Sequence, residues 1–295
     1  MNTPVGVYRN LLGGFLDTDL LARFRQPKSN ADFVTFWHGP LDPITYTCLA
    51  SFPFQGAKLR LYSYEYGVDA PPDVEVADAR TIVRDEGLLT RFIVDGRPSV
   101  SKFSNYFRYT LLRKTAACWV DADLVCLRKP DFSNDPVVFG QQQKADGPWA
   151  LNNAVLKLPK RHPMLKELAD RAKAAVDLDT KWGVIGPLLI TEMARKHELL
   201  DKARPQAEFY PVSFGKFWKA LLPGYRDHVA KVTADSTFLH LWHEYYRESG
   251  YNKQVAPAAG SFLHEWCEKL GTLDRFRRVY RRAELRNVLA AYIKE

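Results

Sequence analysis

The chain contains no run of 18 or more apolar residues, so we expect no segment that spans a lipid bilayer. Residues 1–6 carry no basic stretch that leads into an apolar one, so we expect no secretory signal there. Cysteines are few, and their spacing does not match that of a metal site. Most have apolar neighbours, which predicts buried free thiols in a reducing compartment and, by default, a cytoplasmic protein. They are Cys48, Cys118, Cys126 and Cys267.

The composition is that of a globular protein with a large core. With 295 residues, 46% of them hydrophobic, the chain can fold as one large domain or as a domain with a helical annex. It shows no internal repeat and no low-complexity tract. Strands and helices alternate in the first half, which predicts an α/β fold with a mainly parallel sheet. In such a sheet, ligands bind at the carboxyl ends of the strands.

Hydrophobic periodicity and helix caps predict the elements. We expect Asp42 to be the N-cap of a helix over 43–49, and Ser104 to be the N-cap of the helix that leads into a strand over 118–127. Other strands are expected over 32–37, 57–63, 137–139, 154–158 and 237–242. Further helices are expected over 163–176 and 185–196, followed by two at the C-terminus.

The formal net charge is +8, and much of the excess lies near the end of the chain. Apolar residues recur at helical spacing among the arginines of 275–286, which predicts one basic amphipathic helix. Its arginine face is either a solvated surface of the packed domain or a contact for an anionic carrier or anionic lipid at the inner membrane face. Nucleic acid is not expected as a partner, because the aromatic residues face inward. The arginines are Arg275, Arg277, Arg278, Arg281, Arg282 and Arg286.

Asp121 and Asp123 interrupt the apolar run 118–127 with two carboxylates spaced two residues apart. Residues i and i+2 of a strand point to the same side, so these carboxylates can converge on one point where the strand ends. At about 5–6 Å they would repel each other unless a cation or a bound hydroxyl lies between them. A divalent metal would resolve the repulsion and leave positions open for substrate phosphates. The alternative is a solvated strand end.

Short stretches on both sides of this pair match, in order, the motifs of one enzyme family. They are 33–39, a strand with a Trp and a following Gly; 104–109, Ser-Asn-x-x-Arg-Tyr; 119–123, Trp-x-Asp-x-Asp; and 152–155, 183–187 and 240–243. The sequence resembles the DXD-containing glycosyltransferases of the GT-A fold, in particular family 32 and the glucosylating domains of large clostridial toxins. The resemblance covers about residues 31–243. It implies a GT-A-like, mainly parallel sheet flanked by helices, with a helical C-terminal annex.

The resemblance also implies a division of the chain and a metal site. An N-terminal helical segment (1–30) would precede the catalytic domain (31–245), and basic amphipathic helices (246–295) would pack on that same domain. Mn²⁺ or Mg²⁺ would be held by Asp121, Asp123 and His240. Taken alone, a histidine of this kind is more often part of a core.

The same resemblance implies contacts to a nucleoside diphosphate sugar. Trp37 would stack on the base, although taken alone it is more often a core aromatic residue. Arg108 and Asn105 would hold the sugar, where the family has Asp in place of Asn105. The remaining implied contacts are Asp121 to the ribose, Trp242 to the phosphates, Asn153 as a catalytic residue beside the reacting sugar, and Trp119, Asn152 and Gly186 as further donor-binding residues.

These matches predict a metal-dependent, retaining glycosyltransferase with a saccharide or glycolipid acceptor, as in polysaccharide biosynthesis, or alternatively a protein acceptor. Two other functions stay open. The run 118–127 also fits the nucleophile strand of a haloacid-dehalogenase-type phosphatase, although the later acidic pair of that family is not found, since Asp177 and Asp179 lie beside a helix end. Asn105 would also permit a degenerate sugar-nucleotide binder without activity.

Overall fold

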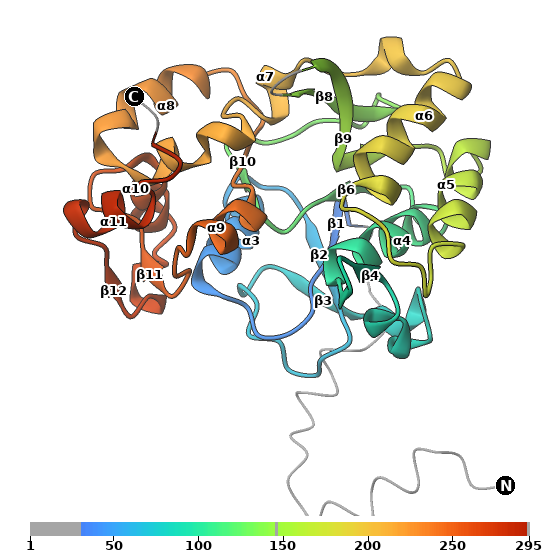
Figure 1. The fold of residues 1–295 in the computed structure, drawn as a ribbon, viewed down its shortest axis with the longest axis horizontal. Helices are drawn as coiled ribbons and strands as arrows, with labels where there is room; N and C mark the ends of the chain where they lie inside the picture. Colours follow the sequence, from blue (N-terminus) through green and yellow to red (C-terminus); the bar gives the residue numbers. More distant parts are fainter. Residues whose placement is uncertain (1–30, 145–146, 294–295) are drawn as a thin grey trace, which may run out of the picture.

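The computed structural model describes residues 31–144 and 147–293, so the helical segment predicted over 1–30 lies outside it. The main sheet has six strands in the order β3-β2-β1-β6-β9-β8 (Figure 1). The first four are parallel, β9 is antiparallel to β6, and β8 is antiparallel to β9. The predicted α/β class with a mainly parallel sheet is confirmed. The strands are β1 Phe33–Phe36, β2 Leu59–Ser63, β3 Glu75–Asp78, β6 Cys118–Val120, β8 Val138–Lys144 and β9 Gly147–Lys157.

Both faces of the sheet are covered, which explains why its central strands read as continuous apolar runs. On one face, Phe33 belongs to a core shared with α3 (Pro43–Phe54) and with the C-terminal elements. On the other, Val34 packs in a core shared with α4 (Val100–Leu112), α5 (Pro163–Lys173) and α6 (Leu189–Lys196). Figure 1 shows α3 and α4 on opposite sides of the strands.

Two helix starts test the capping predictions. Asp42 caps α3 as predicted, because its carboxylate accepts bonds from both the backbone N and the hydroxyl of Thr45. The prediction that Ser104 caps the next helix is wrong: α4 begins at Val100, and the Ser99 hydroxyl accepts the bond from the Lys102 backbone N. Pro98 lies directly before this cap, and proline disfavours a helix that extends past it toward the N-terminus. Because α4 begins at Val100, Ser104 lies in its second turn.

The strand predicted over 118–127 is split in two. β6 ends at Val120, and a turn in which the Leu124 N–H donates to the Asp121 carbonyl leads into β7 (Leu124–Cys126). β7 leaves the main sheet and pairs antiparallel with β10 (Phe238–His240). The two carboxylates therefore converge through a turn, not through the pleat of one strand.

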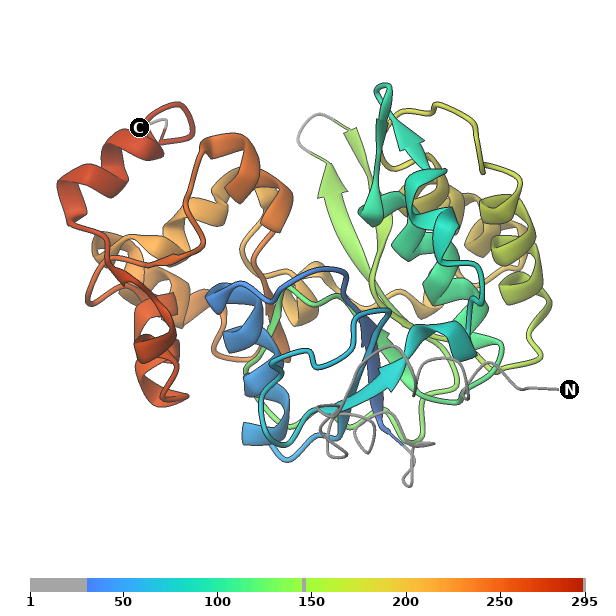
Figure 2. The ribbon, with the colours of Figure 1, turned by 90° about the horizontal axis from the view of Figure 1, so that it is seen from below.

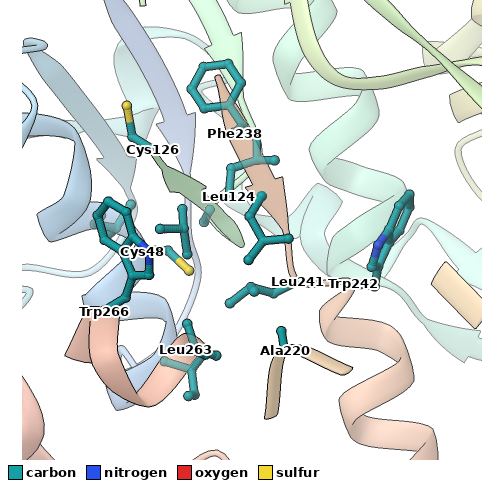
Figure 3. Packing of buried hydrophobic residues seen from close by; sticks show 14 of the residues in the cluster. Cys48, Leu124, Cys126, Ala220, Phe238, Leu241, Trp242, Leu263 and Trp266 are labelled. Carbon is teal, nitrogen blue, oxygen red and sulfur yellow. The ribbon is translucent and has the colours of Figure 1, made fainter. Parts of the chain in front are cut away.

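The strands β7 and β10 lie in the larger core. Figure 3 shows Cys48 of α3, Leu124 and Cys126 of β7, Phe238 of β10 and Leu263 of α10 (Phe262–Lys269) around one packed region. All four cysteines are buried and free, as predicted.

The prediction of one helix over 275–286 is wrong. These residues form η7 (Leu273–Arg275), β12 (Arg278–Val279) and the start of α11 (Arg282–Val288). Arg275 pairs with Asp69, and Arg278 pairs with Glu284. The apolar residues that suggested a helix face, Phe276 and Tyr280, instead enter the core from an extended segment.

The remaining elements are short. None of the described helices is long and apolar enough to cross a membrane. Among residues 79–98 they are η1 Ala79–Thr81, η2 Glu86–Thr90, β4 Ile93–Val94 and β5 Arg97–Pro98. Between 184 and 232 they are η3 Val184–Leu188, η4 Leu200–Lys202, α7 Gln206–Phe209, η5 Phe214–Leu221, η6 Pro223–Tyr225 and α8 Arg226–Val232. The C-terminal ones are α9 His243–Ser249, β11 Val255–Ala256 and α10 Phe262–Lys269.

A close approach at Gly140 of β8 gives a test of the packing. A Cβ added there would lie 2.7 Å from ring atoms of both Phe209 and Tyr210. We expect Gly140→Ala to lower the free energy of unfolding by about 1–3 kcal/mol, the usual cost of overpacking. Urea unfolding measures this, with Gly224→Ala as the control because nothing lies within 4 Å of its added Cβ. Equal stability of the two variants would contradict this packing.

Candidate functional site

The candidate site lies where the strand order of the parallel sheet reverses. From β1 the chain passes through α3 to β2 on one side, whereas β6, on the other side of β1, is reached through α4. Trp37 follows β1 and Asp121 follows β6, at the same edge of the sheet. The carboxyl ends of strands at such a reversal form the usual ligand site of an open α/β sheet.

Asp121, Asp123 and His240 converge at this edge. Each offers a ligand atom, and these atoms all lie within 4.8 Å of one another. His240 ends β10, where it stands opposite Leu124 in the ladder with β7. Its Nε2 lies 3.2 Å from Asp123 Oδ1. The β7–β10 pairing thus brings the histidine to the two carboxylates.

Asp123 is fixed by backbone groups of the chain that follows β10. Its carbonyl accepts a bond from the Leu241 N–H, and its Oδ2 accepts one from the His243 N–H, both at 3.0 Å. Trp242, between those two residues, has a left-handed backbone with φ 58° and ψ 56°. This conformation is uncommon for a bulky residue and is typically found where the surrounding structure enforces it.

The Trp242 side chain also supports His240. The two rings lie 3.9 Å apart between centroids, and the Trp242 indole N–H donates to the Val212 carbonyl at 2.8 Å. Trp242 is only 7% exposed. The structure therefore places it beneath His240, where it orients the imidazole.

Asp121 is fixed by side chains of the sheet and of α4. Its Oδ1 accepts bonds from Trp119 Nε1 at 2.7 Å and from Arg108 Nη2 at 2.8 Å. The Arg108 guanidinium lies over the Trp119 ring, 4.7 Å from its centroid, and also donates to the Asn153 carbonyl. Trp119 is buried and contributes to the site through Asp121 and Arg108.

The two carboxylates have different electrostatic surroundings. Burial raises the pKa of Asp121, and Asp123 acts in the same direction, against the Arg108 guanidinium. Burial would also raise the pKa of Asp123, but the His240 imidazole beside it and the bond from the His243 backbone N–H outweigh burial and hold this pKa well below its ordinary value. Asp123 is therefore the carboxylate that carries its charge most firmly.

This donor set suits a divalent cation. Two carboxylate oxygens and one imidazole nitrogen are ligands that Mn²⁺ accepts, and Mg²⁺ accepts the oxygens. Asp121 is 26% exposed, and both of its hydrogen bonds fall on Oδ1, so Oδ2 is available to a cation. Within the described residues, these three form the one group of this kind.

A second group of predicted residues lies beside Arg108. The Asn153 side-chain amide donates to Asn105 Oδ1 at 2.6 Å and to the Tyr109 hydroxyl at 3.0 Å. Gly186 of η3 approaches the Asn105 side chain, since a Cβ added to Gly186 would lie 3.2 Å from Asn105 Oδ1. The stretches 104–109, 152–155 and 183–187 thus meet in space.

Two predicted residues take other contacts. Asn152 donates to Gln142 Oε1 at 2.6 Å and accepts from the Ala154 N–H, so its side chain bonds within the β8–β9 hairpin and is separate from that of Asn153. Trp37 is half-buried, and its indole N–H donates to the Pro40 carbonyl at 3.3 Å.

Sequence reasoning missed Lys253 and left His243 open. Lys253 Nζ lies 5.5 Å from the centroid of the Trp37 ring and 2.6 Å from an Asp42 carboxylate oxygen. Burial and then the Lys253 charge lower the pKa of His243 to about 4, so its imidazole is neutral at pH 7. Nothing in the sequence around Lys253 signals this placement, because it depends on how the C-terminal segment folds back.

Comparison with known proteins adds only weak similarities. No family model matches the chain, and no curated protein matches it. It is similar to PaToxG Glycosyltransferase, with 12% identity and a TM-score of 0.35, over 59% of this chain and 73% of that one. It is also similar to the apo structure of the WbbM bifunctional glycosyltransferase, with 12% identity and a TM-score of 0.46, over 86% of this chain and 53% of that one. This chain spans about half the length of the second structure, and at these values neither similarity assigns a function.

Metal binding to the candidate site can be tested without an activity assay. We expect Asp123→Ala to weaken Mn²⁺ binding by about 100-fold or more, because even residues that only orient metal ligands change affinity by 10–100-fold. Isothermal titration calorimetry measures the affinity, and the melting temperature without metal checks the fold. Asp131→Ala, which removes an exposed carboxylate bonded to Ser133, is the control. Equal Mn²⁺ affinity in both variants would exclude Asp123 as a ligand.

Proposed function

We propose that this chain is a metal-dependent glycosyltransferase that transfers a sugar from a nucleoside diphosphate sugar to an acceptor. The observation that carries the proposal is the convergence of Asp121, Asp123 and His240 at the strand-order reversal, with Arg108 bonded to Asp121. A leaving nucleoside diphosphate carries negative charge that a divalent cation held by these three residues would neutralise. Mn²⁺ is the favoured ion because one ligand is an imidazole, and Mg²⁺ is the alternative.

The residues of this chain would supply orientation. Asn105 is half-buried and its neutral amide can bond sugar hydroxyls, while the buried Asn153 amide, which donates to Asn105 and to the Tyr109 hydroxyl, would hold Asn105 in place. Arg108 holds the Asn153 backbone and Asp121 together, so the sugar end and the metal end of the site are mechanically linked. Such linkage favours one reactive geometry of the donor. Retention of the anomeric configuration is the outcome that the family resemblance implies.

The acceptor that we propose is a saccharide or a glycolipid, with a protein as the alternative. The cytoplasmic location also stays a prediction. Contact with an anionic membrane was predicted from a single arginine-rich helix, which the fold replaces with three short elements. That contact is therefore not part of the proposal.

Donor hydrolysis without acceptor tests the function directly. With Mn²⁺ present, we expect the wild-type protein to hydrolyse at least one common nucleoside diphosphate sugar slowly, and EDTA to stop the reaction. Asp123→Ala should lower the rate by at least about 100-fold, the usual effect of removing one electrostatic stabiliser of a developing charge. Release of nucleoside diphosphate, followed by chromatography, measures the rate.

Three results would contradict the proposal. Full activity in EDTA would exclude the metal. Hydrolysis of p-nitrophenyl phosphate but of no sugar nucleotide would favour the phosphatase function. Tight binding of a nucleoside diphosphate without turnover would favour a binder that has lost activity.

Asn105 is expected to influence donor choice. Asn105→Asp keeps an acceptor for the Asn153 amide, removes the donor that bonds the Ser101 carbonyl, and adds a negative charge beside Gly186. We expect the relative hydrolysis rates of different sugar nucleotides to change by about tenfold, the effect of about 1.4 kcal/mol. Ser104→Asp, which adds the same charge one residue away on α4, is the control. Identical donor profiles in Asn105→Asp and wild type would mean that Asn105 does not face the donor.

A further inference from the structure

Lys253 belongs to the C-terminal segment, yet its side chain reaches the sheet edge beside the candidate site. Its Nζ lies 2.6 Å from an oxygen of the Asp42 carboxylate and 5.5 Å from the centroid of the Trp37 ring. Lys253 and Asp42 are 211 residues apart in the sequence. The fold thus brings a cation to the end of β1, next to a tryptophan that the family resemblance implies in donor binding.

The turn that carries Lys253 is held by hydrogen bonds on both sides of the lysine. The Val255 N–H donates to the Asn252 carbonyl, and the Gln254 N–H donates to the Asn252 side-chain oxygen, both at 2.9 Å. β11 begins at Val255 and pairs with β12. Figure 2 shows the C-terminal elements, in orange and red, beside α3, in blue. Lys253 therefore projects from an ordered turn toward the start of that helix.

Asp42 compensates the charge of Lys253. The Asp42 side chain is 12% exposed, and its carboxylate accepts bonds from the Thr45 N–H and hydroxyl as well as from the ammonium. Separation of such a pair would leave a largely buried carboxylate without its cation, which is costly. An ammonium held in this way has little free charge to offer a phosphate. It is better suited to keep a neighbouring side chain in place.

Trp37 is the neighbour that Lys253 can restrain. The indole N–H donates to the Pro40 carbonyl of the same loop at 3.3 Å, which is long for such a bond. The ring is half-buried and packs against the edge of the larger core. A cation over an aromatic face is attracted by its π electrons, and tryptophan gives the strongest attraction. Asp42 thus fixes Lys253, and Lys253 restricts the orientation of the Trp37 ring.

We infer that Lys253 is a positioning residue for the donor, because it holds the Trp37 ring in the orientation in which a nucleotide base stacks on it. Lys253 lies over one face of the indole, and the base would stack on the opposite face. A ring that is already fixed loses less conformational entropy when a base stacks on it, so binding is tighter. This inference rests on the proposed transferase function, in which Trp37 contacts the base and the metal cluster serves the phosphates.

Nucleosides and nucleoside diphosphates distinguish positioning of the ring from attraction of a phosphate. The probes are uridine and UDP, guanosine and GDP, adenosine and ADP, and cytidine and CDP, titrated against the full chain with Mn²⁺ and followed by ligand-observed NMR. We expect Lys253→Met to weaken binding of the preferred nucleoside and of its diphosphate by the same factor, about fivefold, as for one cation–π contact. Lys253→Arg should bind like the wild type, because a guanidinium also stacks on an aromatic face and bonds a carboxylate.

A matched control and a double variant test whether the lysine acts through the ring. Lys269→Met removes another cation–π contact of the annex, 4.7 Å over Trp266, and should leave nucleoside binding unchanged. In a Trp37→Ala background, Lys253→Met should weaken binding no further, since two residues that act as a unit are not additive. In donor hydrolysis, Lys253→Met should raise KM and leave kcat nearly unchanged. A merely structural role would lower the melting temperature without this KM-against-kcat split.

The outcomes separate this inference from the proposed function. Weaker diphosphate binding with unchanged nucleoside binding overturns positioning in favour of a direct phosphate contact. Tighter nucleoside binding by Lys253→Met overturns it because the lysine would then compete with the base. Equal affinity of wild type and Lys253→Met in a protein that hydrolyses a donor removes this inference alone. Nucleoside binding that depends on Lys253 and Trp37, in a protein that hydrolyses no donor, supports positioning and removes the transferase. No binding of any probe overturns both.

Discussion

The antiparallel pairing of β7 with β10 is the interaction on which the site depends. It places His240 opposite Leu124, and the bond from the Leu241 N–H to the Asp123 carbonyl continues the ladder by one residue. A shift of one residue would turn the imidazole to the other side of the ribbon. Cys126 and Phe238, which face each other in this ladder, are both buried in the larger core, and this packing fixes the register (Figure 3). Residues far apart in the sequence thus become neighbours through packing, and a buried hydrophobic pairing determines the geometry of a polar site.

The second constraint is the charge balance around Asp121. A carboxylate beside another carboxylate is costly unless cations or hydrogen bonds compensate it. Arg108 supplies that compensation with a side chain only 5% exposed, stacked on Trp119 and tied to the Asn153 carbonyl. Removal of one partner of such a buried pair leaves the other uncompensated, which typically costs 3–5 kcal/mol. Arg108 therefore stabilises the strand ends and the site with the same set of bonds.

Local signals in the sequence were sufficient for the elements whose structure is locally determined. Asp42 with the following proline predicts the start of α3, and the apolar runs predict β1 and β2. The carboxylate pair and His240 could also be named, because their residue types restrict the chemistry. Sequence could not predict that Asp121–Asp123 is a turn, since an apolar run around two polar residues has the same composition whether it is straight or reversed. The helical spacing over 275–286 was misleading because tertiary contacts bury Phe276 and Tyr280 in an extended segment. The sequence also could not show which of the two adjacent asparagines, Asn152 or Asn153, has its side chain beside Asn105.

The C-terminal segment belongs to the site as much as to the periphery of the fold. The boundary predicted at 245/246 falls inside α9, whose first residue, His243, donates its N–H to Asp123. Lys253 reaches back to Asp42, which caps α3, and lies over the ring of Trp37 at the end of β1. One lysine thus joins the annex to a helix N-terminus and to the sheet edge that carries the candidate site. Because these contacts fix residues of β1, of α3 and of the Asp121–Asp123–His240 cluster at once, the annex and the sheet form one structural unit around the candidate site.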